Sequence, residues 1–127
     1  MILVIDVGST GLRAAIVDDG VGVDHVEYRP FAPDTPFPGL VEFDAAAMAT
    51  LVLEAANATL ERAGRPTVAG VGIANQRAST IVWDRATGRP IGPALGWQDL
   101  RTVGECLTAK AEHGLALAPN QTATKLQ

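Results

Sequence analysis

The first thirteen residues, Met1–Arg13, constrain the fold of this chain more than any other segment. Ile2–Ile5 is a continuous apolar run, which is typical of a strand buried on both faces of a sheet. Asp6 follows where the strand reaches the surface, and an unpaired carboxylate there needs water, a cation or hydrogen-bond donors. The small residues of Gly8–Gly11 let the backbone bend tightly and turn its N–H groups toward an anion. The segment therefore predicts a strand, a tight turn and a second strand.

This arrangement suggests a site for a magnesium-bound nucleotide, because Asp6 can serve the metal and the turn amides can serve a phosphate. An ordinary hairpin turn, in which Asp6 only caps backbone amides, explains the same residues. The chain has no Gly-x-x-x-x-Gly-Lys-Ser/Thr sequence, which excludes a P-loop. A dinucleotide fingerprint is also excluded, because Leu12–Asp18 continues as a strand and not as a helix.

The composition excludes two classes of partner. The 127 residues carry a net charge of -4 and no basic stripe, so nucleic acid and anionic membranes are not expected as partners. The single cysteine, Cys106, cannot form an internal disulfide and is typical of a protein of the reducing cytoplasm. No clustered Cys or His pattern occurs, so no structural metal is expected. We expect a cytoplasmic domain.

The hydrophobic pattern predicts an α/β chain with a mixed sheet and flanking helices. A Pro-rich segment, 30–39, should separate the first three strands from a helix that Asp44 caps, that has one apolar face, and that Gly64 ends. Residues 86–88 should form the tip of a hairpin. The predicted strands or extended segments are Ile2–Asp6, Leu12–Asp18, Val21–Tyr28 after a turn at Asp19–Gly20, Leu40–Phe43, Thr67–Ala74 in the centre of the sheet, Ser79–Asp84 and Ile91–Leu95; the second helix is Leu100–Glu112, closed by Gly114.

Several later residues have ordinary structural explanations when each is taken alone. Trp83 and Trp97 suit core positions, and Arg77 suits a solvated surface. Asp99 suits the N-cap of the helix that follows it.

Five segments, however, occur in an order and spacing that are hard to obtain by chance. They are Asp6–Thr10, Pro38–Asp44, Asn75–Thr80, Trp97–Arg101 and Thr124–Leu126. In this arrangement the whole chain resembles the N-terminal part of the FGGY carbohydrate kinases, the family of glycerol kinase and xylulokinase.

The resemblance implies an actin-like ATPase (ribonuclease H-like) fold, in which ATP and Mg2+ lie between two domains. Residues 1–127 would be the N-terminal portion of domain I, and the substrate would be a small sugar or polyol. Asp6 would hold Mg2+ through water, and Arg13 would stabilise the phosphoryl group during transfer. The nucleotide-binding residues implied are Asp6, Gly8, Ser9, Thr10 and Arg13, and the substrate-binding residues implied are Gln76, Arg77, Ala78, Trp97 and Asp99.

Two positions depart from the glycerol kinase pattern. Ala78 stands where those enzymes have Glu, so polyol hydroxyl groups lose an acceptor and a sugar or polyol other than glycerol is expected. Leu40 stands where the family has Trp.

The aspartate that serves these kinases as catalytic base should lie beyond Gln127, so this chain alone is expected to be an inactive fragment. A non-catalytic phosphate- or sugar-binding module, or the first half of a split kinase, is the alternative. A sugar-sensing regulator of another actin-like lineage would not share Asn75–Arg77 together with Trp97–Asp99. Apolar residues within 115–126 and an open sheet edge predict self-association, so a homo-oligomer is expected.

Overall fold

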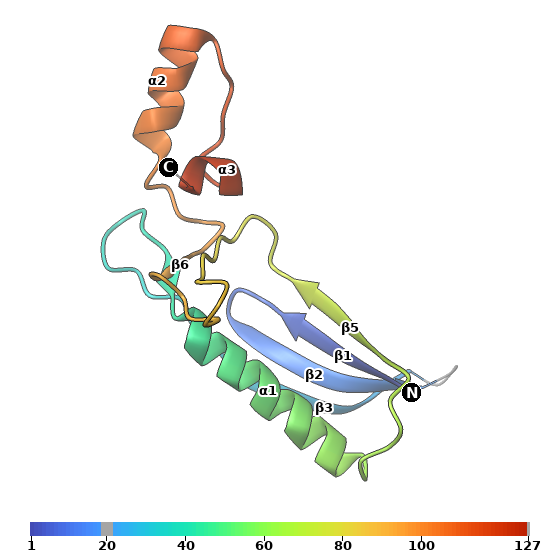
Figure 1. Ribbon diagram of the computed structural model, residues 1–127. Helices are drawn as coiled ribbons and strands as arrows, with labels where there is room; N and C mark the ends of the chain where they lie inside the picture. The colour runs from blue at the N-terminus through green and yellow to red at the C-terminus, as the bar shows by residue number, and fades with distance from the viewer. Residues whose placement is uncertain (19–21, 127) are drawn as a thin grey trace. The chain divides into compact units, whose positions relative to one another are not determined.

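The computed structural model describes residues 1–18 and 22–126 (Figure 1). The chain divides into two compact units, each made of two segments. Unit 1 comprises residues 1–32 and 46–76, and unit 2 comprises residues 33–45 and 77–127.

Unit 1 is built on a four-stranded mixed sheet with the order β3-β2-β1-β5. β1 (Ile2–Val7), β2 (Gly11–Asp18) and β3 (Gly22–Pro30) form an antiparallel meander. β5 (Gly70–Asn75) runs parallel to β1, and a parallel neighbour needs a long connection, which here includes the helix α1 (Ala45–Arg62). As a result, the carboxyl ends of β1 and β5 lie side by side, next to the β1–β2 turn.

α1 covers one face of this sheet with its apolar side (Figure 1). Thr59 on that side is fully buried, and its hydroxyl group donates a hydrogen bond of 3.1 Å to the carbonyl of Ala14. The buried hydroxyl therefore has a partner. The apolar face predicted for this helix is confirmed. The buried residues of the core are Leu3, Ile5, Val7, Leu12, Ala14, Ile16, Ala55 and Ala56, and Met48, Leu51, Val52, Leu60, Ala63 and Val68 pack partly buried against them.

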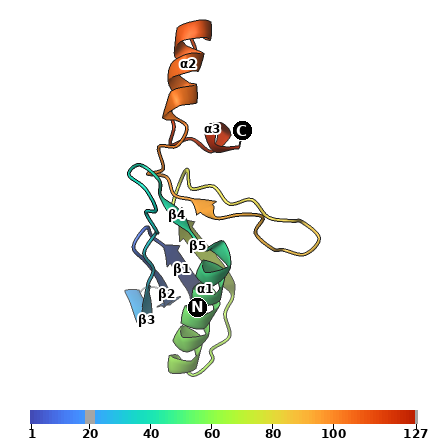
Figure 2. The same cartoon turned by 90° about the vertical axis from the view of Figure 1, so that its left-hand side faces the viewer.

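Unit 2 has much less regular structure. β4 (Glu42–Phe43) pairs with β6 (Ala94–Leu95) in an antiparallel ladder, and two helices follow, α2 (Val103–His113) and α3 (Thr122–Lys125). Figure 2 shows the segment before β6 as a long projecting loop.

The mixed α/β architecture and most predicted elements are confirmed, with ends that move by a few residues. Gly64 and Gly114 have φ values of +74° and +67°, as expected for glycines that end helices. The predicted Asp19–Gly20 turn and the first residue of the predicted strand at Val21 lie outside the described residues. α3 was not predicted.

Three predictions about elements are wrong. In the projecting loop the segment 79–84 forms only isolated bridges, Thr80 with Leu95 and Trp83 with Pro90, because prolines there lack the N–H that a ladder needs. β5, which was predicted as a central strand, is an edge strand of the sheet. α2 begins at Val103 and not at Leu100, because the preceding residues form a turn in which the Asp99 carboxylate accepts the N–H of Arg101.

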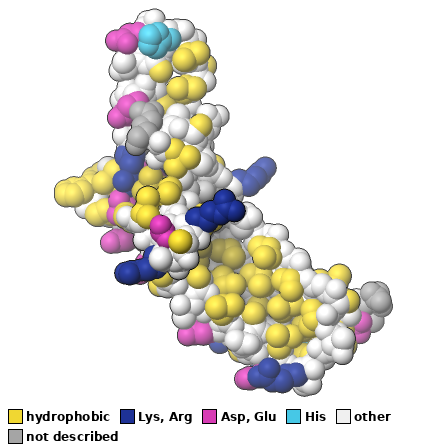
Figure 3. All heavy atoms as spheres, viewed as in Figure 1, with side chains coloured by type: hydrophobic (Ala, Val, Ile, Leu, Met, Phe, Trp, Pro, Cys, Tyr) yellow, Lys and Arg dark blue, Asp and Glu magenta, His cyan; other side chains and the backbone are white. Residues whose placement is uncertain are grey.

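The sheet face that carries α1 continues beyond the helix onto β5. Val71 and Ile73 lie beside the buried Leu3 and Ile5 in the ladder, yet they are 57% and 68% exposed. Figure 3 shows hydrophobic side chains gathered over these strands. The β-branched side chains of Val71 and Ile73 predicted a buried central strand, but they form an exposed apolar surface. In the part of the chain that is described, no helix is both long and apolar enough to span a bilayer.

Candidate functional site

The turn between β1 and β2 is held from its carbonyl side by three residues from two other segments of unit 1. The Gln76 side-chain amide donates to the Gly8 carbonyl at 2.8 Å. The Tyr28 hydroxyl donates to the Thr10 carbonyl at 3.2 Å, and the N–H of Phe31 donates to the same oxygen at 3.1 Å. These bonds, together with the one from the Gly8 N–H to the Gly11 carbonyl at 2.9 Å, hold the turn in a tight bend.

A side chain at either of two glycines in this turn would require its neighbours to move. A Cβ at Gly8 would lie 3.0 Å from the Gly11 carbonyl oxygen. A Cβ at Gly11 would overlap the Tyr28 ring, with its Cζ atom at 2.6 Å. The two glycines therefore permit close packing, and neither has a positive φ.

Asp6 and Arg13 face each other across the β1–β2 ladder. Nη1 of Arg13 lies 3.5 Å from Oδ2 of Asp6, and the side chains are 56% and 48% exposed, so this ion pair is weak. The Arg13 guanidinium also lies over the Tyr28 ring, 5.2 Å from its centroid, which is within the range of a cation–π contact. The half-exposed Asp6 carboxylate therefore remains open to solvent beside the turn.

The structure places Gln76 with these residues, in unit 1, and the other predicted sugar-facing residues in unit 2. Arg77 is exposed. Trp97 is 43% exposed, and its backbone N–H donates to the Ser79 hydroxyl at 3.1 Å. Trp83 is 59% exposed. The interpretation of Trp83 and Trp97 as core aromatics is therefore wrong, and Arg77 does lie on the surface.

Asp99 is fully buried, and its carboxylate accepts four hydrogen bonds from the protein. Oδ2 accepts from the N–H of Val41 at 2.7 Å and from Nη2 of Arg101 at 2.9 Å. Oδ1 accepts from the N–H and from Nε of Arg101, at 3.0 Å and 2.8 Å. The N-cap of α2 is Thr102, so Asp99 is not the cap of that helix. Its contacts favour a role in shaping the loop that carries Trp97.

The pKa values in this loop follow from the same contacts. Burial raises the pKa of the Asp99 carboxyl, but the hydrogen bonds from Arg101 and Val41 outweigh burial and lower it to about 2. The bond to Asp99 is the main reason that the pKa of Arg101 is raised. Burial lowers the pKa of the Lys125 ammonium group, whereas the nearby Asp99 charge acts in the opposite direction. Asp99 is therefore ionised at neutral pH.

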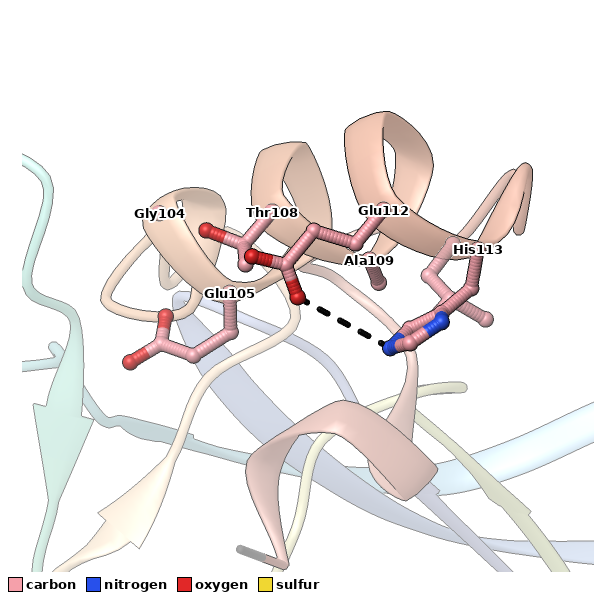
Figure 4. A pocket seen from close by; sticks show the side chains of 7 residues that line it. Gly104, Glu105, Thr108, Ala109, Glu112 and His113 are labelled. Atoms are coloured by element: carbon pink, nitrogen blue, oxygen red, sulfur yellow. Dashed lines mark ion pairs between the residues drawn. The ribbon is translucent and has the colours of Figure 1, made fainter.

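α2 carries a separate hollow of about 440 Å3, shown in Figure 4. The picture shows Glu105, Thr108 and Glu112 on one side of the helix, and Glu112 lies 3.8 Å from His113. The side chains of this last pair are 65% and 66% exposed, so the contact is weak. None of the predicted site residues lines this hollow.

Solved structures identify the fold. The structure of Plasmodium falciparum glycerol kinase with ADP superposes with a TM-score of 0.87 and 23% identity, covering 98% of this chain and 28% of the other. A kinase structure from Brucella ovis, titled "xyloylose kinase", gives a TM-score of 0.84 at 23% identity, covering 98% and 27%. The chain therefore has the N-terminal portion of the actin-like ATPase fold.

Sequence comparison then identifies the family. Residues 1–126 match the profile of the N-terminal domain of the FGGY family of carbohydrate kinases. Glycerol kinase of Trichlorobacter lovleyi is 40% identical over 136 residues, and that of Bordetella pertussis is 42% identical over 107 residues. The matches cover 98% and 83% of this chain but only 27% and 21% of those proteins. The chain belongs to the FGGY family and spans about a quarter of the length of its curated relatives.

The structure also places beside the predicted site residues two side chains for which the sequence indicated no role. Tyr28 contacts the β1–β2 turn from β3, and its place opposite Arg13 is visible only once the strand register is known. Lys125 reaches two carbonyls in the loops that carry Arg77 and Trp97. The Thr124–Leu126 motif was a signal for Lys125, although it indicated no role for the lysine.

Proposed function

We propose that the protein containing this chain is an ATP-dependent kinase that transfers the γ-phosphoryl group of ATP to a hydroxyl group of a small sugar or polyol. The observation that carries this proposal is the turn after β1, whose carbonyls Gln76, Tyr28 and Phe31 hold in a tight bend. Bends of this kind can present N–H groups to a phosphate. Membership of the FGGY family supplies the class of reaction.

The residues of unit 1 fit a magnesium-bound nucleotide. Gly8, Ser9 and Thr10 would approach the terminal phosphates. The Gly8 N–H already donates to the Gly11 carbonyl, so the N–H groups of Ser9 and Thr10 would be the phosphate donors. Among the described residues no three His, Cys, Asp or Glu side chains gather, so Mg2+ would rest on Asp6 through water and on the phosphates themselves. Bound there, the ion would neutralise phosphate charge.

Arg13 would stabilise the charge on the phosphoryl group during transfer. Its guanidinium is planar and permanently charged, and the contact with the Tyr28 ring limits the positions that it can take. Gln76, which the sequence placed in the substrate site, would act instead by fixing the turn.

The acceptor would bind to unit 2 through Arg77 and Trp97. Guanidinium donors suit hydroxyl groups, and an indole face packs against the C–H groups of a sugar. The named relatives are glycerol kinases, but Ala78 offers no carboxylate to glycerol hydroxyls, so we propose another sugar or polyol as substrate. The family resemblance implies that Asp99 binds the substrate directly. We propose that it supports the Trp97 loop.

The 127-residue chain by itself would be inactive, because it supplies one part of the site and no residue that serves as catalytic base. We propose the cytoplasm as its compartment, on the basis of the single cysteine.

The test is ADP formation by the protein as the cell makes it, with Mg2+ and a panel of pentoses, hexoses and polyols that includes glycerol. We expect ADP formation with one class of acceptor, and none from residues 1–127 alone. Asp6→Asn should lower kcat/KM about a hundredfold. Asp24→Asn, whose side chain is 83% exposed, is the matched control and should have no effect.

Two results would replace this proposal. Sugar or phosphate binding without ADP formation for any acceptor would indicate a non-catalytic binding module. ADP formation that requires a second, separately encoded polypeptide would indicate the first half of a split kinase.

A further inference from the structure

Lys125, the last residue of α3, is a buried lysine in unit 2 whose ammonium group bonds to two loops. Its exposure is 8%. Nζ donates to the Gly96 carbonyl at 2.6 Å and to the Ala78 carbonyl at 3.1 Å. Each carbonyl belongs to the residue next to a proposed substrate contact, since Ala78 follows Arg77 and Gly96 precedes Trp97.

Both carbonyls belong to residues with a constrained backbone, and that of Gly96 also accepts the N–H of Asp99 at 3.1 Å. Ala78 has φ of +61°, in the left-handed region that disfavours a residue with a Cβ, and the bond from Lys125 fixes its carbonyl. Gly96 packs so closely on Val41 that a Cβ would lie 2.8 Å from Cγ1 of that valine. Two hydrogen bonds between the backbones of Thr80 and Leu95, at 2.8 and 2.9 Å, join the same two loops close to Ala78 and Gly96.

We propose that Lys125 is a positioning residue for the acceptor site, which sets the separation and orientation of Arg77 and Trp97 by binding the carbonyls of Ala78 and Gly96. This inference rests on the proposed function, in which those two side chains bind the sugar or polyol.

A cation suits this task better than a neutral side chain would. Hydrogen bonds from a charged donor are shorter and stronger than neutral ones, and the 2.6 Å bond to Gly96 belongs to that class. The Asp99 carboxylate, which lies in the loop after Trp97, favours this charge, whereas burial and the Arg101 guanidinium oppose it. Lys125 also lines a hollow of about 210 Å3 beside Thr80. A substituted side chain of similar length therefore has room at position 125.

The experiment compares Lys125→Met with Lys110→Met in the protein as the cell makes it. The chain has two lysines, and Lys110 is the exposed one, on α2, so it is a matched control. The first measurement is the fluorine NMR spectrum after incorporation of 5-fluorotryptophan, with the Trp97 resonance identified by its loss in Trp97→Phe. We expect Lys125→Met to shift and broaden the Trp97 resonance and to leave that of Trp83 unchanged. Lys110→Met should change neither.

The second measurement separates the two substrates. Lys125→Met should raise the KM for the acceptor about tenfold and change the KM for ATP less than twofold, because a misplaced contact affects only the ligand it serves. Equal changes for both substrates, or a Trp97 resonance identical to that of the Lys110→Met control, would overturn the inference. If Lys125→Met does not fold, Lys125→Arg takes its place, with a threefold rise in acceptor KM expected and the same two results against it.

The NMR measurement needs no acceptor and no turnover. A protein that forms no ADP with any acceptor would therefore end the proposed function, while the response of Trp97 would still decide whether Lys125 orders its loop.

Discussion

Arg101 binds the buried carboxylate of Asp99 along one edge, with Nε 2.8 Å from Oδ1 and Nη2 2.9 Å from Oδ2. Nη2 also bonds to Glu42 at 2.7 Å, so one guanidinium joins β4 to the loop that carries Trp97. The N–H of Val41 completes the set. A carboxylate held in this way fixes the loop and leaves little acceptor capacity for a substrate.

Asp99→Asn should destabilise the chain by about 3 kcal/mol, because it leaves Arg101 without its buried partner. Urea unfolding followed by circular dichroism measures the change. Glu61→Gln removes the Arg65–Glu61 ion pair on α1, whose side chains are 66% and 62% exposed, and should cost less than about 0.5 kcal/mol. Similar costs for both variants would show that the Asp99 network adds no more than a surface pair.

The Asp99 carboxylate should also make the free energy of unfolding depend on pH in the acidic range. The pKa of Asp99 is about 2 in the folded chain against an ordinary value of 3.8, so the unfolded state takes up the proton first as the pH falls. The contribution, about 2 kcal/mol, is fully present above the unfolded value and is lost as the pH falls from about 4 to about 2. Unfolding free energies of Asp99→Asn, measured from about pH 6 to about pH 2.5, should lack this component.

The comparison with the variant is needed because other carboxyl groups also titrate in this range. Hydrogen bonds from Arg62 and Arg29 lower the pKa of Glu27, and bonds from Thr87 lower that of Asp84. Parallel curves for the parent chain and Asp99→Asn would contradict the assignment to Asp99.

Sequence predicted the parts of this chain that depend on near neighbours. The strand, turn and strand of residues 2–18 and the apolar face of α1 follow from periodicity, which is local information. The contacts of Gln76 with Gly8 and of Lys125 with Gly96 join residues 68 and 29 positions apart, and no local pattern encodes them. The projecting loop misled the prediction because its residues favour strands while its prolines prevent a ladder.

Gly11→Ala should weaken nucleotide binding about tenfold, because the new methyl group would displace the Tyr28 ring that holds Thr10 and contacts Arg13. Isothermal titration of ATP with Mg2+ into the protein as the cell makes it measures the effect. Gly70→Ala is the matched control, since Gly70 also begins a strand and nothing lies within 4 Å of its Cβ position. Equal affinities of the two variants for ATP would show that the position of Tyr28 does not affect nucleotide binding by the turn.

The exposed apolar residues of β5 should cause the 127-residue chain to self-associate. Ile73 is 68% exposed on the same sheet face as the core, and β5 also presents an unpaired edge. Apolar surface next to such an edge is the common route to pairing between copies. Ile73→Lys should therefore shift the chain toward monomer in light scattering at high concentration. Leu53→Lys on α1, where the leucine is 64% exposed, is the control and should leave the association unchanged. A parent chain that stays monomeric at high concentration would contradict the prediction, and an equal response to both lysine substitutions would show that added charge, and not the β5 surface, governs association.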